Sequence, residues 1–254
     1  MTETSASLHH RRLTNRGEEA RQTALHIMHE ALDAISVRDH LNWPHVATLL
    51  PHAIAILEQA QGEVAEVVGA LCTKLDRYFD ARGDYTTATL YSERSLAIAK
   101  AALGADHPTT GARLNNLAWL YESQGRYGDA EPLYLRALAI AEATLGESHP
   151  DTGLSLNNLA LLYNSQRRYD EAEPLFIRAL AISEAALGSD HFTTGTRLNN
   201  LALLYNSQDR LSEAEPLCQR ALAIFRETLG VDHPSTEIVR ANYKNLRRRI
   251  TGDF

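Results

Sequence analysis

The chain has 254 residues, of which 44% are hydrophobic and 22% are charged, and its formal net charge is −7. This composition supplies enough apolar surface for a folded core and too little net charge to enforce disorder. The negative charge disfavours nucleic acid and anionic membranes as partners, because no sustained basic stripe offsets it. The first residues lack the apolar segment of a signal peptide, and no stretch approaches the ~20 apolar residues that span a bilayer. We therefore expect a soluble, cytoplasmic protein.

The N-terminal quarter carries the weakest pattern. Residues 1–16 are polar and predict a disordered tail. Within residues 17–61, HAIAILE at 52–58 matches RALAIAE at 136–142, and Trp43 matches Tyr127 two periods later. These matches predict a degenerate helical repeat over 17–61.

A period of 42 residues governs the rest of the chain. Segments 103–144 and 145–186 agree at 28 of 42 positions, and 187–228 continues the pattern. Segment 62–102 is a worn copy in which Asp76 takes the small-residue position of Ala118. A tandem period of this length is typical of a solenoid, in which each unit packs only against its neighbours. We predict repeats over 62–102, 103–144, 145–186 and 187–228, then a C-terminal capping helix within 229–254.

Each repeat contains two helical patterns separated by a short break. Apolar residues of the first pattern fall at i, i+3, i+4 and i+7, at Leu114, Leu117, Ala118 and Tyr121. The second pattern has the same spacing, at Ala130, Tyr134, Ala137 and Leu138. We expect Pro132 in the first turn of the second helix, and Gly146 at its C-terminal end in a left-handed conformation.

These positions resemble the consensus of the tetratricopeptide repeat. The 42-residue unit, with LGxxHP and LNNLAxLY, is similar to the repeats of kinesin light chains and of bacterial arrays attached to nucleotide-binding signalling proteins. The resemblance covers roughly residues 62–250. It implies an all-α, right-handed superhelix of helix-turn-helix units that acts as a non-catalytic scaffold for protein–protein interaction.

Residues that could carry chemistry are better explained by the repeat. Four histidines recur once per unit, at His107, His149, His191 and His233. Stacked helices lie ~8–10 Å apart, so these side chains cannot converge on one ion, and we expect them in loops or helix caps. The chain contains no phosphate-binding or hydrolase motif, so we expect no catalytic residue, metal or cofactor.

Two further features have structural interpretations. Cys218 takes the position of Tyr134 and is expected to be a buried hydrophobe. An arginine recurs on the second helices, at Arg94, Arg136, Arg178 and Arg220. We expect this ladder to pair with the glutamates of neighbouring units, Glu131, Glu173 or Glu215.

The resemblance also implies a binding groove, because the first helices of such arrays line a concave face. One asparagine per unit falls on that side, at Asn116, Asn158, Asn200 and Asn242. An apolar residue flanks three of them, at Trp119, Leu161 and Leu203. Asn115, Asn157 and Asn199 are weaker candidates for the same face. In the worn repeat, Lys74 and Arg77 replace Asn116 and Trp119.

A carboxamide offers both a donor and an acceptor, as an extended peptide backbone requires. The basic start and apolar floor suit a peptide with acidic and large apolar residues, similar to the cargo motifs of kinesin light chains. Alternatively, the asparagines bond between helices, and the groove is empty or holds the chain's own tail. Two other functions stay open: the sensor arm of a bacterial signalling ATPase or protease system, and an enzyme with a site within the helices. The oligomeric state also stays open.

Overall fold

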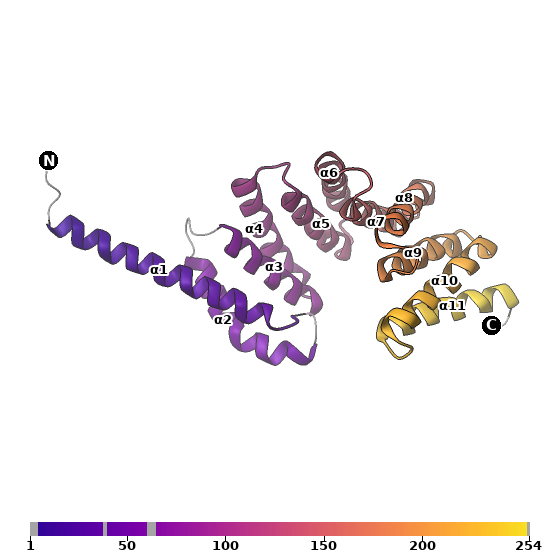
Figure 1. Ribbon diagram of the computed structural model, residues 1–254, viewed down its shortest axis with the longest axis horizontal. Coiled ribbons are helices and arrows are strands. Elements are labelled where there is room, and N and C mark those ends of the chain that lie inside the picture. Colours follow the sequence, from indigo (N-terminus) through magenta and orange to yellow (C-terminus); the bar gives the residue numbers. More distant parts are fainter. Residues whose placement is uncertain (1–4, 38–39, 60–64, 253–254) are drawn as a thin grey trace. The chain divides into compact units, whose positions relative to one another are not determined.

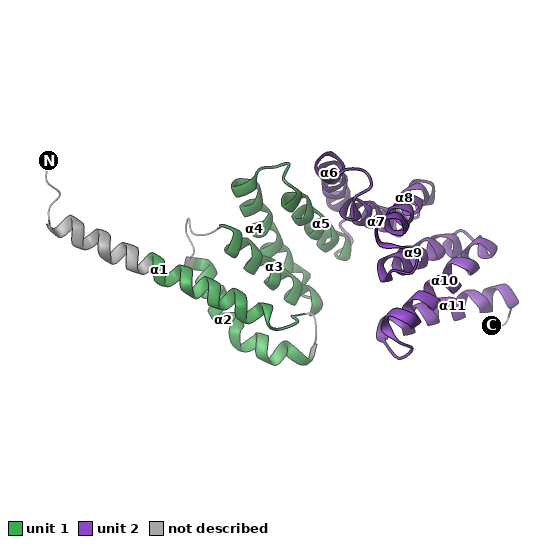
Figure 2. Ribbon diagram, in the orientation of Figure 1, with its two compact units in different colours: residues 1–124 green, residues 125–254 purple. Residues whose placement is uncertain are grey.

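The computed structural model describes residues 5–37, 40–59 and 65–252, and the helices in these ranges divide between two compact units, residues 1–124 and 125–254 (Figures 1 and 2). Unit 1 contains α1 (Ser5–Asp33), the short 3-10 helix η1 (His40–Asn42), α2 (Trp43–Gln59), α3 (Ala65–Ala81), α4 (Tyr85–Leu103) and α5 (Pro108–Ser123). Unit 2 contains α6 (Tyr127–Leu145), α7 (Pro150–Ser165), α8 (Tyr169–Leu187), α9 (Phe192–Ser207), α10 (Leu211–Leu229) and α11 (Pro234–Thr251). Within each unit, helices adjacent in sequence pack together, which confirms the predicted all-helical repeat fold.

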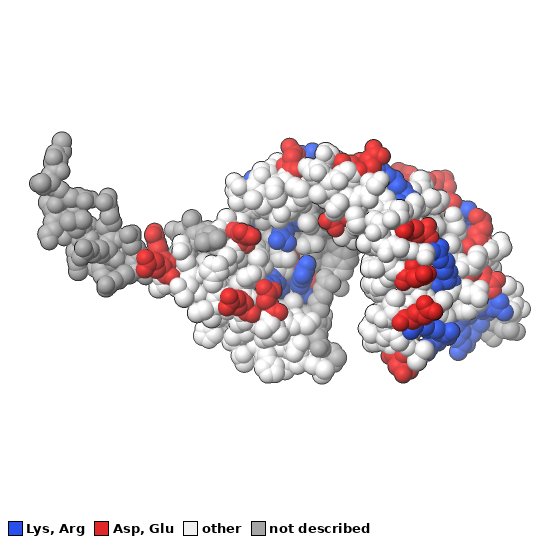
Figure 3. All heavy atoms as spheres, viewed as in Figure 1, with Lys and Arg blue, Asp and Glu red and all other residues white. Residues whose placement is uncertain are grey.

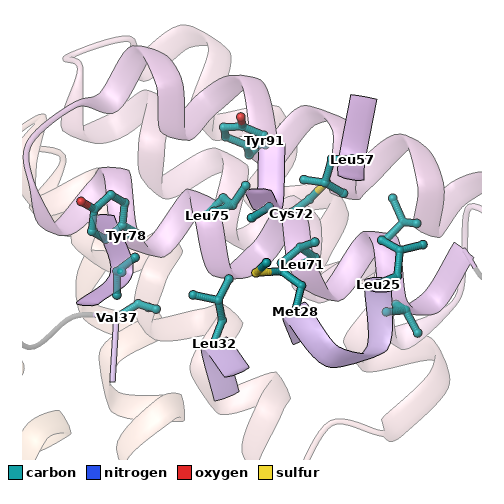
Figure 4. Packing of buried hydrophobic residues seen from close by; sticks show 14 residues of the cluster. Leu25, Met28, Leu32, Val37, Leu57, Leu71, Cys72, Leu75, Tyr78 and Tyr91 are labelled. Atoms are coloured by element: carbon teal, nitrogen blue, oxygen red, sulfur yellow. The ribbon is translucent and has the colours of Figure 1, made fainter. Parts of the chain in front are cut away.

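The core of unit 1 joins four helices, α1 to α4 (Figure 4). Leu25, Met28 and Leu32 of α1 point toward Leu71 and Leu75 of α3, and all five side chains are buried. Helix α1 begins at Ser5, so the segment expected to be a tail is helical from that residue, while residues 1–4 lie outside the described ranges. Ala, Leu, Arg and Glu are strong helix formers, and they dominate the sequence that follows.

The core of unit 2 repeats at each helix pair. Leu156 packs with Ala179 and Ile182, and one period later Leu198 packs with Ala221 and Ile224. Cys218 of α10 is 2% exposed, which confirms its prediction as a buried hydrophobe.

A histidine caps the helix that follows each loop between consecutive repeats. His149 is the N-cap of α7, and its Nδ1 accepts a hydrogen bond from the backbone N–H of Asp151 at 3.1 Å. The same bond forms at His107, His191 and His233, which confirms the expected cap role. Gly146, three residues before His149, has a positive φ of 96° as expected, but its ψ of 160° lies outside the left-handed helical region, so that part of the expectation is wrong. That combination is essentially restricted to glycine.

The expected position of Pro132 within the second helix is wrong. Pro132 lies inside α6 in its second turn, because the helix begins five residues earlier, at Tyr127. The C=O of Gly128 loses its helical donor because Pro132 has no N–H, and Gly128 is exposed.

The arginine ladder exists with different partners. Arg178 pairs with Glu142 at 2.5 Å and Arg220 pairs with Glu184 at 2.6 Å, each joining two consecutive second helices. The glutamates expected to receive them bond instead to the arginines that precede second helices: Glu131 to Arg168 and Glu173 to Arg210. Spacing alone does not show which flank of the helix each side chain occupies.

Candidate functional site

The candidate binding surface in unit 2 lies on the first helices α7, α9 and α11. We call it the asparagine face and define it by Leu154, Asn158, Asn200, Ile238 and Asn242. The three asparagines are partly exposed, one on each helix. Asn157 and Asn199, the preceding residues, are 3% and 8% exposed.

A chain of carboxamide hydrogen bonds links these helices. Asn200 Nδ2 donates to Asn157 Oδ1 at 2.9 Å, and Asn242 Nδ2 donates to Asn199 Oδ1 at 3.2 Å. Asn157 Nδ2 in turn lies 3.4 Å from Asn158 Oδ1. The alternative that the asparagines bond between helices therefore holds in part: Asn157 and Asn199 are the buried acceptors, and Asn200 and Asn242 are the donors.

The exposed asparagines keep unused capacity. A primary carboxamide has two N–H donors and an oxygen with two lone pairs. Within the described residues, Asn200 and Asn242 each spend one N–H on the neighbouring helix. Each keeps a second N–H and its oxygen, and the existing bond restricts the rotation of the side chain.

Apolar residues flank the asparagines, and two of them escaped the sequence analysis. Leu161 and Leu203 are partly exposed as expected. Leu154 and Ile238, four residues before Asn158 and Asn242, are 43% and 61% exposed. A comparison of this position across the repeats would have found Leu154 and Ile238, because successive repeats hold Ala112, Leu154, Thr196 and Ile238 there.

Unit 1 holds the remaining predicted residues. Trp119 is 41% exposed on α5, Asn116 is partly exposed and Asn115 is buried. Lys74 forms an ion pair with Asp33 of α1, and burial together with Arg77 lowers the pKa of its ammonium. The charge of Lys74 is thus compensated within unit 1, whereas Arg77 is exposed.

The burial of two charged residues was not predicted, although Asp76 was noted at the small-residue position of Ala118. Arg197 of α9 is 6% exposed, its Nε has no hydrogen-bond partner among the described residues, and burial lowers its pKa to about 10. Asp76 of α3 is 4% exposed, its Oδ2 is equally unsatisfied, and burial raises its pKa to about 7.

The two cysteines are unsuited to nucleophilic chemistry. Burial raises the pKa of both Cys72 and Cys218 to about 11, which keeps them as unreactive thiols at neutral pH. No group of three His, Cys, Asp or Glu suited to a metal ion occurs in the described part of the chain. None of the helices within the described ranges is long and apolar enough to cross a membrane.

Comparison with known proteins agrees with this architecture. Models of the tetratricopeptide repeat match residues 63–143, 122–185, 151–216 and 193–254. Among solved structures, a protein described as a kinesin light chain of Podospora anserina, with nearly identical TPR-like repeats, is 26% identical; the match covers 75% of this chain and 90% of that one, with a TM-score of 0.63. BtubC (BKLC) from P. vanneervenii is 23% identical over 92% of this chain and 85% of that one, with a TM-score of 0.61. No curated protein sequence gave a significant match. Because the repeat models match three quarters of its length, this chain belongs to the tetratricopeptide repeat family, a protein-interaction fold.

Proposed function

We propose that the chain is a non-catalytic scaffold whose asparagine face binds an extended segment of a partner protein. The observation that carries the proposal is the repetition of one partly exposed carboxamide on each of α7, α9 and α11, next to exposed Leu154 and Ile238.

Spacing supports an extended ligand. Packed helices lie ~8–10 Å apart and an extended chain rises ~3.3 Å per residue, so successive asparagines meet about every third residue of a bound strand. Each such hydrogen bond contributes only about 0.5–1.5 kcal/mol. The asparagines would therefore set the register of the peptide and leave most of the sequence preference to the flanking side chains.

The flanking residues indicate a class of partner. Leu154 and Ile238 offer apolar surface to large aliphatic or aromatic side chains. Within unit 1 alone, Trp119 on α5 offers similar surface, and exposed Arg77 takes the equivalent position on α3 and suits an acidic residue. The surface of unit 1 therefore suits a peptide with acidic and large apolar residues, and the asparagine face of unit 2 suits one with large apolar residues.

The test starts from peptides selected against the full chain from a random display library. Their affinity is measured for the wild type, Leu154→Glu and Asn200→Ala. Ile177→Glu is the matched control, because Ile177 lies on the second helix α8 and is 47% exposed, close to the 43% of Leu154. We expect Leu154→Glu to weaken binding about tenfold, since a charge placed against an apolar contact costs more than 1.4 kcal/mol. Equal affinities for Leu154→Glu and Ile177→Glu would reject the proposal.

A further inference from the structure

The C-terminal face of unit 2 departs from the repeat in a systematic way. We call it the cap face: Gln219, Leu222, Ala223 and Arg226 of α10 with Arg240, Tyr243, Lys244 and Arg247 of α11, which together line an open hollow of about 550 Å³. Figure 3 shows Lys and Arg side chains gathered over α10 and α11.

Four cap-face residues lie on α11. One period earlier, on α9, the equivalent residues pack against the second helix of their repeat. In α9 those positions hold Leu198, Leu201, Ala202 and Tyr205, all buried. In α11 they hold Arg240, Tyr243, Lys244 and Arg247. No helix of the described residues covers the hollow, so the surface that buries leucine in one repeat presents cations in the next.

Position 226 reverses a charge in the same way. Glu142 and Glu184 accept the arginine of the following second helix, from Arg178 and Arg220. One period later the equivalent residue is Arg226. A helix that lies beside α10 as α10 lies beside α8 would therefore need an acidic residue where the repeat has arginine.

The cations of the cap face are only partly compensated. Arg240 pairs with Glu237 and Arg247 pairs with Glu215. The side chains of Arg226 and Lys244 have no hydrogen bond or ion pair with any described residue. Leu222 and Tyr243 line the same hollow and add apolar surface to it. We propose that the cap face binds an amphipathic acidic helix of a partner protein, which takes the place of the second helix of a repeat.

The probe is a synthetic peptide with the α8 sequence, residues 169–187, in which Arg178 and Ala179 are both changed to Glu. The matched peptide carries Gln at both positions. It controls for a peptide that binds by replacing α8 of the protein instead of binding at the cap face. Binding to the full chain is measured by fluorescence anisotropy at low and at high salt. The protein variants are Arg226→Glu and Lys244→Glu, and the control is Lys100→Glu, an exposed residue of α4 that gives the same change in net charge.

We expect the Glu peptide to bind about tenfold more tightly than the Gln peptide, and salt to reduce the difference. Each cap-face variant should weaken the Glu peptide about three- to tenfold, because an attraction becomes a repulsion, while Lys100→Glu should not. Equal binding of the two peptides, or variants that match Lys100→Glu, would show a merely solubilising surface and overturn the proposal. Sedimentation that revealed a dimer lost on Lys244→Glu would overturn it too, since the occupant would be a second copy.

Discussion

Asn200 on α9 donates its Nδ2 hydrogen to Asn157 Oδ1 on α7, 2.9 Å away. The acceptor is 3% exposed, whereas the donor lies on the partly exposed asparagine face. The buried oxygen of Asn157 thus joins the consecutive first helices α7 and α9. Asn200 keeps its second N–H and its oxygen at the partly exposed surface. The same pair of residues thus forms an interhelical hydrogen bond and, in the proposed function, lies at the peptide contact.

This bond should be measurable as a coupling. We expect Asn157→Ala and Asn200→Ala each to reduce the free energy of unfolding, by about 1 kcal/mol, with Asn157→Ala the larger loss because it empties a buried site. In urea unfolding, the double variant should fall short of additivity by about 0.5–1.5 kcal/mol. Strict additivity would mean that the two side chains do not interact in solution.

Buried Asp76 should make unit 1 more stable when Asp76 is protonated. Burial dominates its raised pKa of about 7, and Arg77 and Arg113 only partly oppose it. The folded state therefore holds the proton more tightly than the unfolded state, so stability falls as the pH rises from about 4 to about 7. Asp76→Ala restores the alanine of the other repeats and should gain about 1–3 kcal/mol at pH 8. The gain should shrink at pH 5, as measured by urea unfolding; a gain independent of pH would contradict this account.

The turn before α8 stores strain at Arg167, whose φ is 60°. The equivalent residues Gly83 and Gly125 adopt positive φ without a side chain. Arg167→Gly should stabilise the protein by about 0.5–1 kcal/mol, since relief of a left-handed residue outweighs the added chain entropy. Asp209→Gly, at φ 63°, is the comparison: it should gain less, because Asp209 also accepts from Arg249 at 2.8 Å. Thermal unfolding of both variants decides, and a lower midpoint for Arg167→Gly would refute the strain.

His149 should contribute as a cap through one acceptor atom. We expect His149→Ala to cost about 0.5–2 kcal/mol and His149→Asn to restore most of the loss, because Asn is a strong N-cap residue. The measurement is chemical unfolding of both variants at pH 8. If Asn and Ala gave the same loss, the Nδ1 bond would not be the stabilising element.

The sequence predicted the elements where its repeat is regular. The alternation of LNNLAxLY with EAEPLxxRALAI yields α7 to α10, and the recurrent histidines mark the first-helix N-termini. The partners of pairings across helices escaped prediction: Arg178 meets Glu142 instead of Glu131, and the interhelical bond expected of the asparagines as an alternative runs from Asn200 to Asn157. Such contacts depend on the rotation of each helix about its axis, and a shift of one residue turns a side chain by about 100°. Asp76 and Arg197 escaped for another reason, because both are exceptions to the rule that charged residues avoid burial.

The central proposal is that the carboxamides of the asparagine face form hydrogen bonds with a peptide main chain. The most direct measurement is the spectrum of the side-chain amides in ¹⁵N-labelled protein, titrated with a library-selected peptide. The account predicts saturable shifts of the Nδ2 signals of Asn158, Asn200 and Asn242, with the affinity measured by anisotropy. Binding that left those three signals in place, and moved signals of the second helices instead, would contradict it.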